Sequence, residues 1–112
     1  MTNEILGGFQ QLVMLAVVRL AEAAYGARIQ DELEQTAGRS VSISTVYVTL
    51  DRLERRGYVA SWLADPTPIR GGKSKRYYRV TKAGLDALRQ SREELERMWQ
   101  GVETSLEAGP PR

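Results

Sequence analysis

Apolar residues recur every three or four positions over four segments of the chain, and this spacing predicts four helices. The first segment carries a wide apolar stripe from Ile5 to Leu20, which favours a helix buried on more than one side. Thr2 and Asn3 can cap this helix. The second segment is short and begins after Gly26. It ends at Gly38, because glycine is typical of the left-handed residue that closes a helix.

The third segment has an apolar side and a largely polar side. The residues expected in the core are Val46, Leu50 and Leu53, and Ile43 lies on the same apolar side. At about 100° per residue, the opposite side carries Ser44, Thr45, Val48, Asp51, Arg52 and Arg55. Ser42 or Ser44 can cap this helix, which we expect to run to about Arg56 and to close at Gly57.

Two short runs of strand-forming residues, 58–63 and 76–80, follow the third helix. The connector between them contains Pro66, Pro68, Gly71 and Gly72, which keep it irregular. This arrangement predicts an antiparallel hairpin with a long loop. We expect Trp62 to pack on the hairpin.

The last segment begins after Thr81, a second candidate cap. Its apolar residues follow a heptad-like spacing: Leu85, Leu88, Leu95, Trp99, Val102 and Leu106. A helix from Lys82 to Ala108, although weakened by Gly101, would be ~40 Å long and would overhang a domain about 30 Å across. An overhanging apolar seam needs a second surface, most simply another copy of the chain. We therefore expect a homodimer.

The order helix, helix, helix, strand, strand, helix is that of a winged helix-turn-helix. The predicted fold is thus mainly helical with a small β-hairpin, an α+β fold with a long C-terminal dimerisation helix. Within one compact unit, we expect residues 1–80 to form the winged helix-turn-helix, the part that such folds use to bind DNA, including the N-terminal helix, and residues 81–109 to form the dimerisation helix.

The composition excludes several classes of enzyme. The 112 residues include no cysteine and no histidine, which removes thiolate nucleophiles, cysteine-based metal sites and the commonest general base. No nucleophile–base arrangement stands out among the other residues, so we expect no catalysis, no metal and no cofactor. The longest apolar run, residues 12–18, is far shorter than the ~20 residues of a membrane span. We expect a cytoplasmic protein without membrane contact.

Charge is concentrated in the middle of the chain. The net charge is +2, but from Arg39 to Lys82 ten basic residues meet three acidic ones, a local balance of +7 that leaves −5 elsewhere. A basic patch suggests a polyanionic partner, although a merely solvated basic face gives the same counts. This block includes the third helix, which can enter a major groove about 12 Å wide, and the hairpin loop, which can reach the minor groove. Double-stranded DNA is the expected partner.

Several stretches resemble the PadR family of bacterial transcription regulators. They are YGARIQDELEQTAG, STVYVTLDRLERRGYV, WLADPTPIRGGKSKRYYRVT and KAGLDAL, and the resemblance covers about residues 12–88. It implies a winged-helix homodimer that binds a near-palindromic operator and usually represses transcription. It also implies the short type of PadR protein, in which the first and last helices supply the dimer contacts.

The resemblance places the recognition helix at Ile43 to Arg56, the wing tip at residues 71–73 and the returning strand at residues 76–78. With the charge pattern, it gives these candidate DNA-binding residues: Ser42, Ser44, Thr45, Tyr47, Val48, Arg52, Arg55, Gly71, Gly72, Lys73, Lys75 and Arg76. Val48 departs from the pattern, because a polar residue that reads bases is expected there.

The candidate dimer contacts are Phe9, Leu12, Leu88, Leu95, Trp99 and Val102. Some PadR-like proteins accept flat aromatic effectors near the dimer interface, which makes Trp99 the candidate wall of an effector pocket. An alternative function is a protein-interaction module that has lost DNA binding, suggested by the exposed seam of the last helix. The basic loop argues against it, because such a module has no need for that charge.

Overall fold

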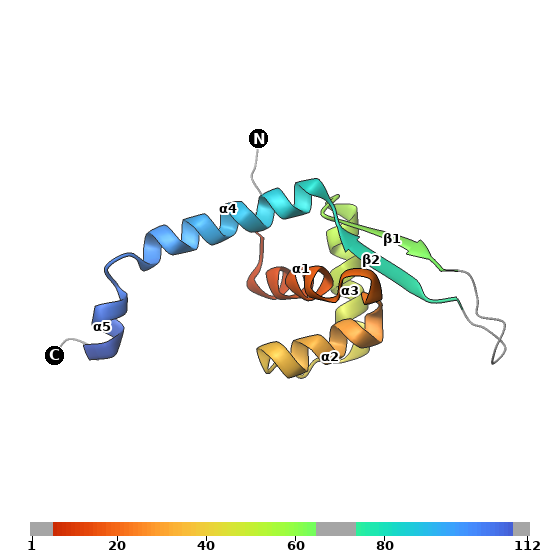
Figure 1. Cartoon of the computed structure of the whole chain (residues 1–112), viewed down its shortest axis with the longest axis horizontal. Helices are drawn as coiled ribbons and strands as arrows, with labels where there is room; N and C mark the ends of the chain where they lie inside the picture. Colours follow the sequence, from red (N-terminus) through yellow and green to blue (C-terminus); the bar gives the residue numbers. More distant parts are fainter. Residues whose placement is uncertain (1–5, 65–73, 109–112) are drawn as a thin grey trace.

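The computed structural model describes residues 6–64 and 74–108. In chain order the elements are α1 (Gly8–Leu20), the 3-10 helix η1 (Ala21–Ala23), α2 (Gly26–Ala37), α3 (Ile43–Arg55), β1 (Val59–Leu63), β2 (Arg76–Val80), α4 (Lys82–Trp99) and α5 (Glu103–Ala108). Helices α1, α2 and α3 pack together, the β1–β2 hairpin extends to one side and α4 extends to the other (Figure 1). The mainly helical winged helix-turn-helix with a small hairpin is confirmed.

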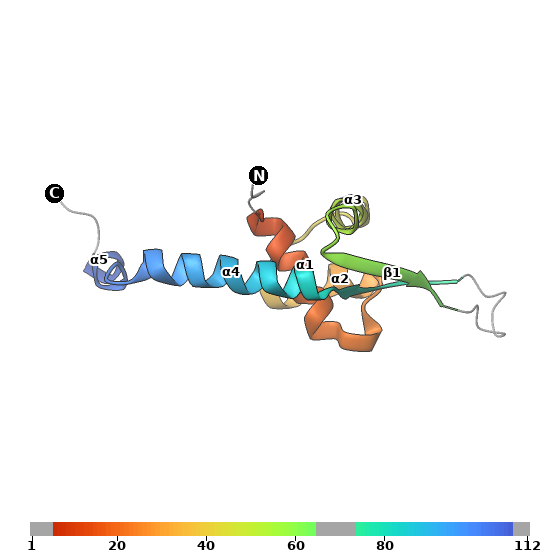
Figure 2. The same cartoon turned by 90° about the horizontal axis from the view of Figure 1, so that it is seen from above.

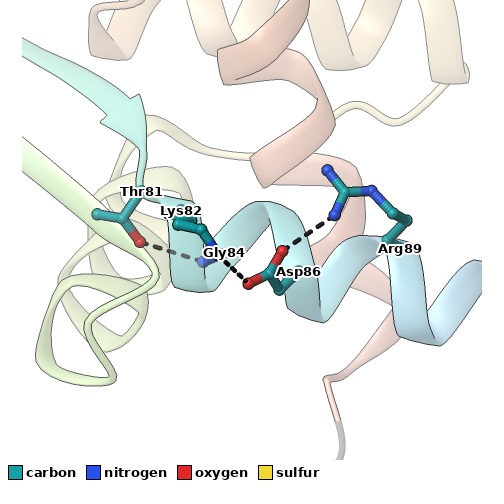
Figure 3. A network of polar contacts seen from close by, with 5 residues as sticks. All are labelled: Thr81, Lys82, Gly84, Asp86 and Arg89. Carbon is teal, nitrogen blue, oxygen red and sulfur yellow. Dashed lines mark hydrogen bonds and ion pairs between the residues drawn. The ribbon is translucent and has the colours of Figure 1, made fainter.

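The ends of the helices follow local chemistry. The Ser42 hydroxyl accepts a hydrogen bond from the amide of Thr45 at 3.1 Å and caps α3. The Thr81 hydroxyl accepts from the amide of Gly84 at 3.1 Å and caps α4, as Figure 3 shows. Helix α2 closes at Gly38 with φ 66°, and Gly57 after α3 has φ 79°. These predictions from the sequence are confirmed.

The predicted start of the first helix was wrong. Helix α1 begins at Gly8, preceded by Gly7 in an extended conformation, so Leu6 lies outside the helix. Two successive glycines disfavour continuation of the helix, and the side chain of Gln10 accepts a hydrogen bond from the Gly7 amide at 3.3 Å. The expected caps, Thr2 and Asn3, lie outside the described residues.

The single helix expected from residue 82 to residue 108 was also wrong. Helix α4 ends at Trp99, and the separate helix α5 turns away from its axis (Figure 1). The break falls where Gly101 adopts φ 80°, a left-handed conformation that glycine takes without strain. The overhang itself is present, because α4 projects well beyond the packed helices.

The core lies between α1, α2, α3 and the hairpin. Its fully buried side chains include Val13, Met14, Val17, Ile29, Leu33, Val46, Leu50 and Leu53. This confirms the three expected core residues of α3, whereas Ile43 at the start of the helix is 37% exposed. Strands β1 and β2 pair antiparallel, with Val59 opposite Val80 and Trp62 opposite Tyr77. Viewed from above, α3 lies on one side of the hairpin (Figure 2).

Helix α4 joins the core only at its beginning. Gly84 and Leu88 are buried, and a Cβ atom on Gly84 would collide with the carbonyl oxygen of Tyr58, so only glycine allows this close approach. Asp86 binds Lys82 at 3.1 Å and Arg89 at 3.0 Å on the solvent side of the same turns (Figure 3). After Leu88 every residue of α4 except the half-buried Ser91 is exposed.

Candidate nucleic-acid interface

The exposed side of α3 brings most of the predicted recognition residues together. We call this the outer face of α3 and define it by its exposed side chains: Ser42, Ser44, Thr45, Val48, Arg52 and Arg55. Val48 is 50% exposed, so an apolar side chain lies at the centre of a polar surface. Because the N-terminal side chains are short, a nucleic-acid groove can approach the backbone of α3 closely.

The two arginines of this face differ in their surroundings. Arg55 forms an ion pair with Asp51 at 2.6 Å, one helical turn away, so part of its charge is balanced within α3. Arg52 is exposed, and in the described part of the chain no carboxylate lies within ion-pair distance of it. Arg52 is therefore the cation of α3 with the most charge left for a phosphate.

The hairpin turns its two described candidate cations to opposite faces, because side chains alternate along a strand. The Lys75 ammonium lies 4.2 Å from the centre of the Tyr25 ring, a cation–π contact on the face away from α3. Arg76 donates to the Ser61 hydroxyl at 2.9 Å, and Ser61 donates to Glu54 of α3 at 2.8 Å. The wing-tip candidates, residues 71–73, lie outside the described residues.

Three aromatic rings join the hairpin to the start of α2. Tyr25 meets Tyr77 edge-on with ring centres 5.5 Å apart, and Trp62 stacks on Tyr77 at 6.1 Å. Tyr25 also forms a β-bridge with Tyr77, and the Tyr78 amide donates to the Ala24 carbonyl at 2.9 Å. The predicted packing of Trp62 on the hairpin is confirmed. The contact of Tyr25 with the hairpin was missed, because nothing in its local sequence pairs it with residue 77.

One tyrosine of β2 and one of α3 lie near enough to influence each other electrostatically. Tyr78 is buried, which raises the pKa of its phenol, and the nearby Tyr47 phenol raises it further. Tyr47 is 45% exposed and lies on the flank of α3 between the core and the outer face. Its ring rests against Gly26, the first residue of α2. The sequence marked Gly26 only as the start of a helix.

A second surface lies between α1 and the projecting part of α4. It is a cleft of about 540 Å³ lined mainly by apolar side chains: Gln11, Leu15, Val18, Leu85, Leu88, Arg89, Arg92, Leu95, Glu96 and Trp99. Of the candidate dimer residues, Leu95 is 57% exposed, Trp99 43% and Val102 40%. The other three are placed differently: Leu88 is buried within the chain, and Phe9 and Leu12 are half-buried against the core. Leu15 and Val18 were not singled out, because they lie beside the main apolar stripe of α1.

The arrangement of α3, the hairpin and α4 matches that of known regulators. The model of the transcriptional regulator PadR-like family matches residues 14–90. The chain belongs to this family. A PadR family transcriptional regulator from Eggerthella lenta is 33% identical, with a TM-score of 0.68 over 88% of this chain and 84% of that one. No curated protein matches the chain.

More distant structures share the fold. A PadR family transcription regulator from Clostridium difficile is 22% identical, with a TM-score of 0.68 over 88% of this chain and 99% of that one. A transcriptional regulator from Clostridium thermocellum is 23% identical, with a TM-score of 0.68 over 85% of this chain and 89% of that one. Membership of the PadR-like family makes this chain a DNA-binding regulator of transcription, which is not an enzyme class.

Membrane and metal sites were also considered over the described segments, 6–64 and 74–108. None of their helices has both the length and the apolarity needed to cross a bilayer. Nor do these segments bring three acidic side chains together in a way that could hold a metal ion.

Proposed function

We propose that this PadR-family protein is a repressor that binds a near-palindromic operator as a homodimer. The outer face of α3 carries the proposal, because it gathers short polar side chains and the exposed Arg52 on one helix surface. Ser44, Thr45 and Val48 contact base edges in the major groove, and Val48 is suited to a thymine methyl group. Arg52 and Arg55 serve the phosphate backbone, with Lys73 at the minor groove.

The second half of α4, residues 91–99, supports the homodimer. Leu95, Met98 and Trp99 are all exposed on it, and a cluster of large apolar side chains in water favours association. The same helix of a second copy, packed along α4, would bury this cluster. The two recognition helices would then meet half-sites about 34–36 Å apart, one turn of DNA.

The cleft also supports an aromatic effector that relieves repression. Trp99 offers a flat apolar wall for a stacked ring. Flat aromatic compounds should quench Trp99 fluorescence in a Trp62→Phe variant, which leaves Trp99 as the reporter. In the Trp62→Phe/Trp99→Phe variant the affinity for these compounds should fall.

Selection of genomic DNA tests the main proposal. Fragments retained by the purified protein are sequenced, and the affinity for the selected site is measured by fluorescence anisotropy over a range of salt concentrations. We expect a palindromic sequence and a log–log salt slope of about −0.9 for each phosphate contacted. Transcription in vitro from a promoter that carries the site should fall when the protein is added. Retention without sequence preference would contradict the operator, and a rise in transcript would contradict repression.

A further inference from the structure

The first turn of α2 and the neighbouring flank of α3 meet at Gly26 and Tyr47. Gly26 is buried, and a Cβ atom at this position would lie 2.5 Å from Cζ and 2.8 Å from Cε1 of Tyr47, and closer still to its hydroxyl oxygen. Carbon atoms in contact prefer separations of about 3.5–4.0 Å. Any side chain at position 26 would therefore displace the ring of Tyr47.

The flank of α3 that carries Tyr47 is held at a second point two helical turns further on. Glu54 accepts the hydrogen bond from Ser61 at 2.8 Å, and Arg76 donates to Ser61 at 2.9 Å. At about 100° per residue, Tyr47 and Glu54 lie on nearly the same line along α3. The same flank is therefore fixed against α2 at one end and against the hairpin at the other.

We propose that Tyr47 is a positioning residue: seated against Gly26, its ring fixes the angle at which α3 presents its outer face to DNA. This inference rests on the proposed function. In a helix-turn-helix the recognition helix enters the groove while the preceding helix crosses the backbone, so their relative placement sets which side chains reach the bases. A recognition site requires support to within about 0.5 Å from the packing around it.

The shape around the ring shows what a methyl group at position 26 would do. The core side of α3 is filled by Val46 and Leu50, which are fully buried. Since Tyr47 lies between this core and the exposed outer face, a ring displaced from Gly26 moves toward the outer face or pushes α2 and α3 apart. Either change alters the surface that faces the groove.

A double-mutant cycle tests the inference with the DNA site selected by the wild-type protein. We expect Gly26→Ala to lower the affinity about tenfold in the wild-type background, the loss expected of one good base contact. In the Tyr47→Ala background, where no ring remains to collide, the same change should cost less than about twofold. Gly8→Ala is the matched control, because Gly8 also begins a helix and a Cβ atom there would meet nothing within 4 Å.

Tyr47→Phe separates positioning from direct contact. It keeps the ring and removes the hydroxyl, so affinity within about twofold of wild type and an unchanged salt slope are expected, since no phosphate contact is lost. Thermal unfolding of each variant shows whether it is folded. If Gly26→Ala does not fold, a large loss for Tyr47→Ala with none for Tyr47→Phe still supports the inference.

Three results would overturn it. The first is a Gly26→Ala penalty of equal size with and without the ring, and the second is no penalty at all. The third is a loss in Tyr47→Phe as large as in Tyr47→Ala, which would make the hydroxyl a direct DNA contact. A wild-type protein that binds no DNA would instead overturn the proposed function, and this inference with it.

Discussion

The outer face of α3 and the second half of α4 are both exposed to water, but they differ in the kind of partner that each one suits. On α3 the exposed residues are mostly polar, and water molecules supply their hydrogen bonds until a DNA groove displaces that water. On α4 the exposed residues include Leu95, Met98 and Trp99, whose burial is worth about 25 cal/mol for each Å² removed from water. The comparison teaches that exposure has opposite meanings on the two helices: one face suits a charged ligand, and the other lacks an apolar partner.

The largest expected effect comes from placing charge in the exposed apolar cluster of α4. The Leu95→Glu/Trp99→Glu variant should be monomeric, because dimerisation would bury two carboxylates from each copy in an apolar seam. Operator affinity should then fall by about 10²–10⁴, the advantage of two linked half-sites. Light scattering and anisotropy measure the two changes. Gln90→Glu, an exposed position near the start of the projecting part, is the control and should remain dimeric. A dimer that persists in the double variant would place the interface elsewhere.

Removing Arg52, which has no ion-pair partner within residues 6–64 and 74–108, should have a smaller effect. Arg52→Ala is expected to weaken operator binding about tenfold and to reduce the salt slope by about one phosphate contact. Arg55→Ala should cost less, because its guanidinium is already paired with Asp51 at 2.6 Å. Fluorescence anisotropy at several salt concentrations shows which of the two variants loses more affinity. Equal losses would show that the Asp51 pair opens when DNA binds.

Lysines 73 and 75 test whether a lysine that lies on an aromatic ring still contributes its charge to DNA binding. Lys73→Ala should lower the affinity and change the salt slope by about 0.9, as expected for a lost phosphate contact. Lys75→Ala should leave the slope nearly unchanged, because its ammonium lies on the Tyr25 ring, on the face away from α3. Tyr25→Leu removes the same contact while keeping the charge. A full change of slope in Lys75→Ala would show that this side chain turns to the DNA.

The smallest effect concerns pH and the first turns of α4. The hydrogen bond from Lys82, with a further contribution from Arg89, holds the pKa of Asp86 below its ordinary value of 3.8. A lowered pKa in the folded state stabilises the protein above pH 3.8, and this contribution is lost as the pH falls through the folded-state pKa. The melting temperature of wild type should therefore drop slightly more than that of Asp86→Asn on acidification below that value. Identical drops would mean that the two contacts are not maintained in solution.

Much of the molecule could be predicted because its determinants are local. Ser42 and Thr81 cap α3 and α4 through amides only three residues away, and Gly38 and Gly57 close turns that disfavour a side chain. The core positions of α3 follow from the helical period alone. Where local signals competed, the prediction failed: the apolar spacing of the last segment continued past Gly101, but the backbone did not.

What the sequence by itself determined is therefore the set of elements, their polar and apolar sides and the basic middle block. Only the tertiary structure decided which cations stay available, since Lys75 meets Tyr25 across 50 residues of chain and Arg76 reaches Glu54 through Ser61. The tertiary structure also placed the ring of Tyr47 against Gly26 and formed the cleft between α1 and α4. The physical reason is that spacing along a chain fixes directions within one helix or strand. The distance between two such elements is fixed by packing that involves all of them.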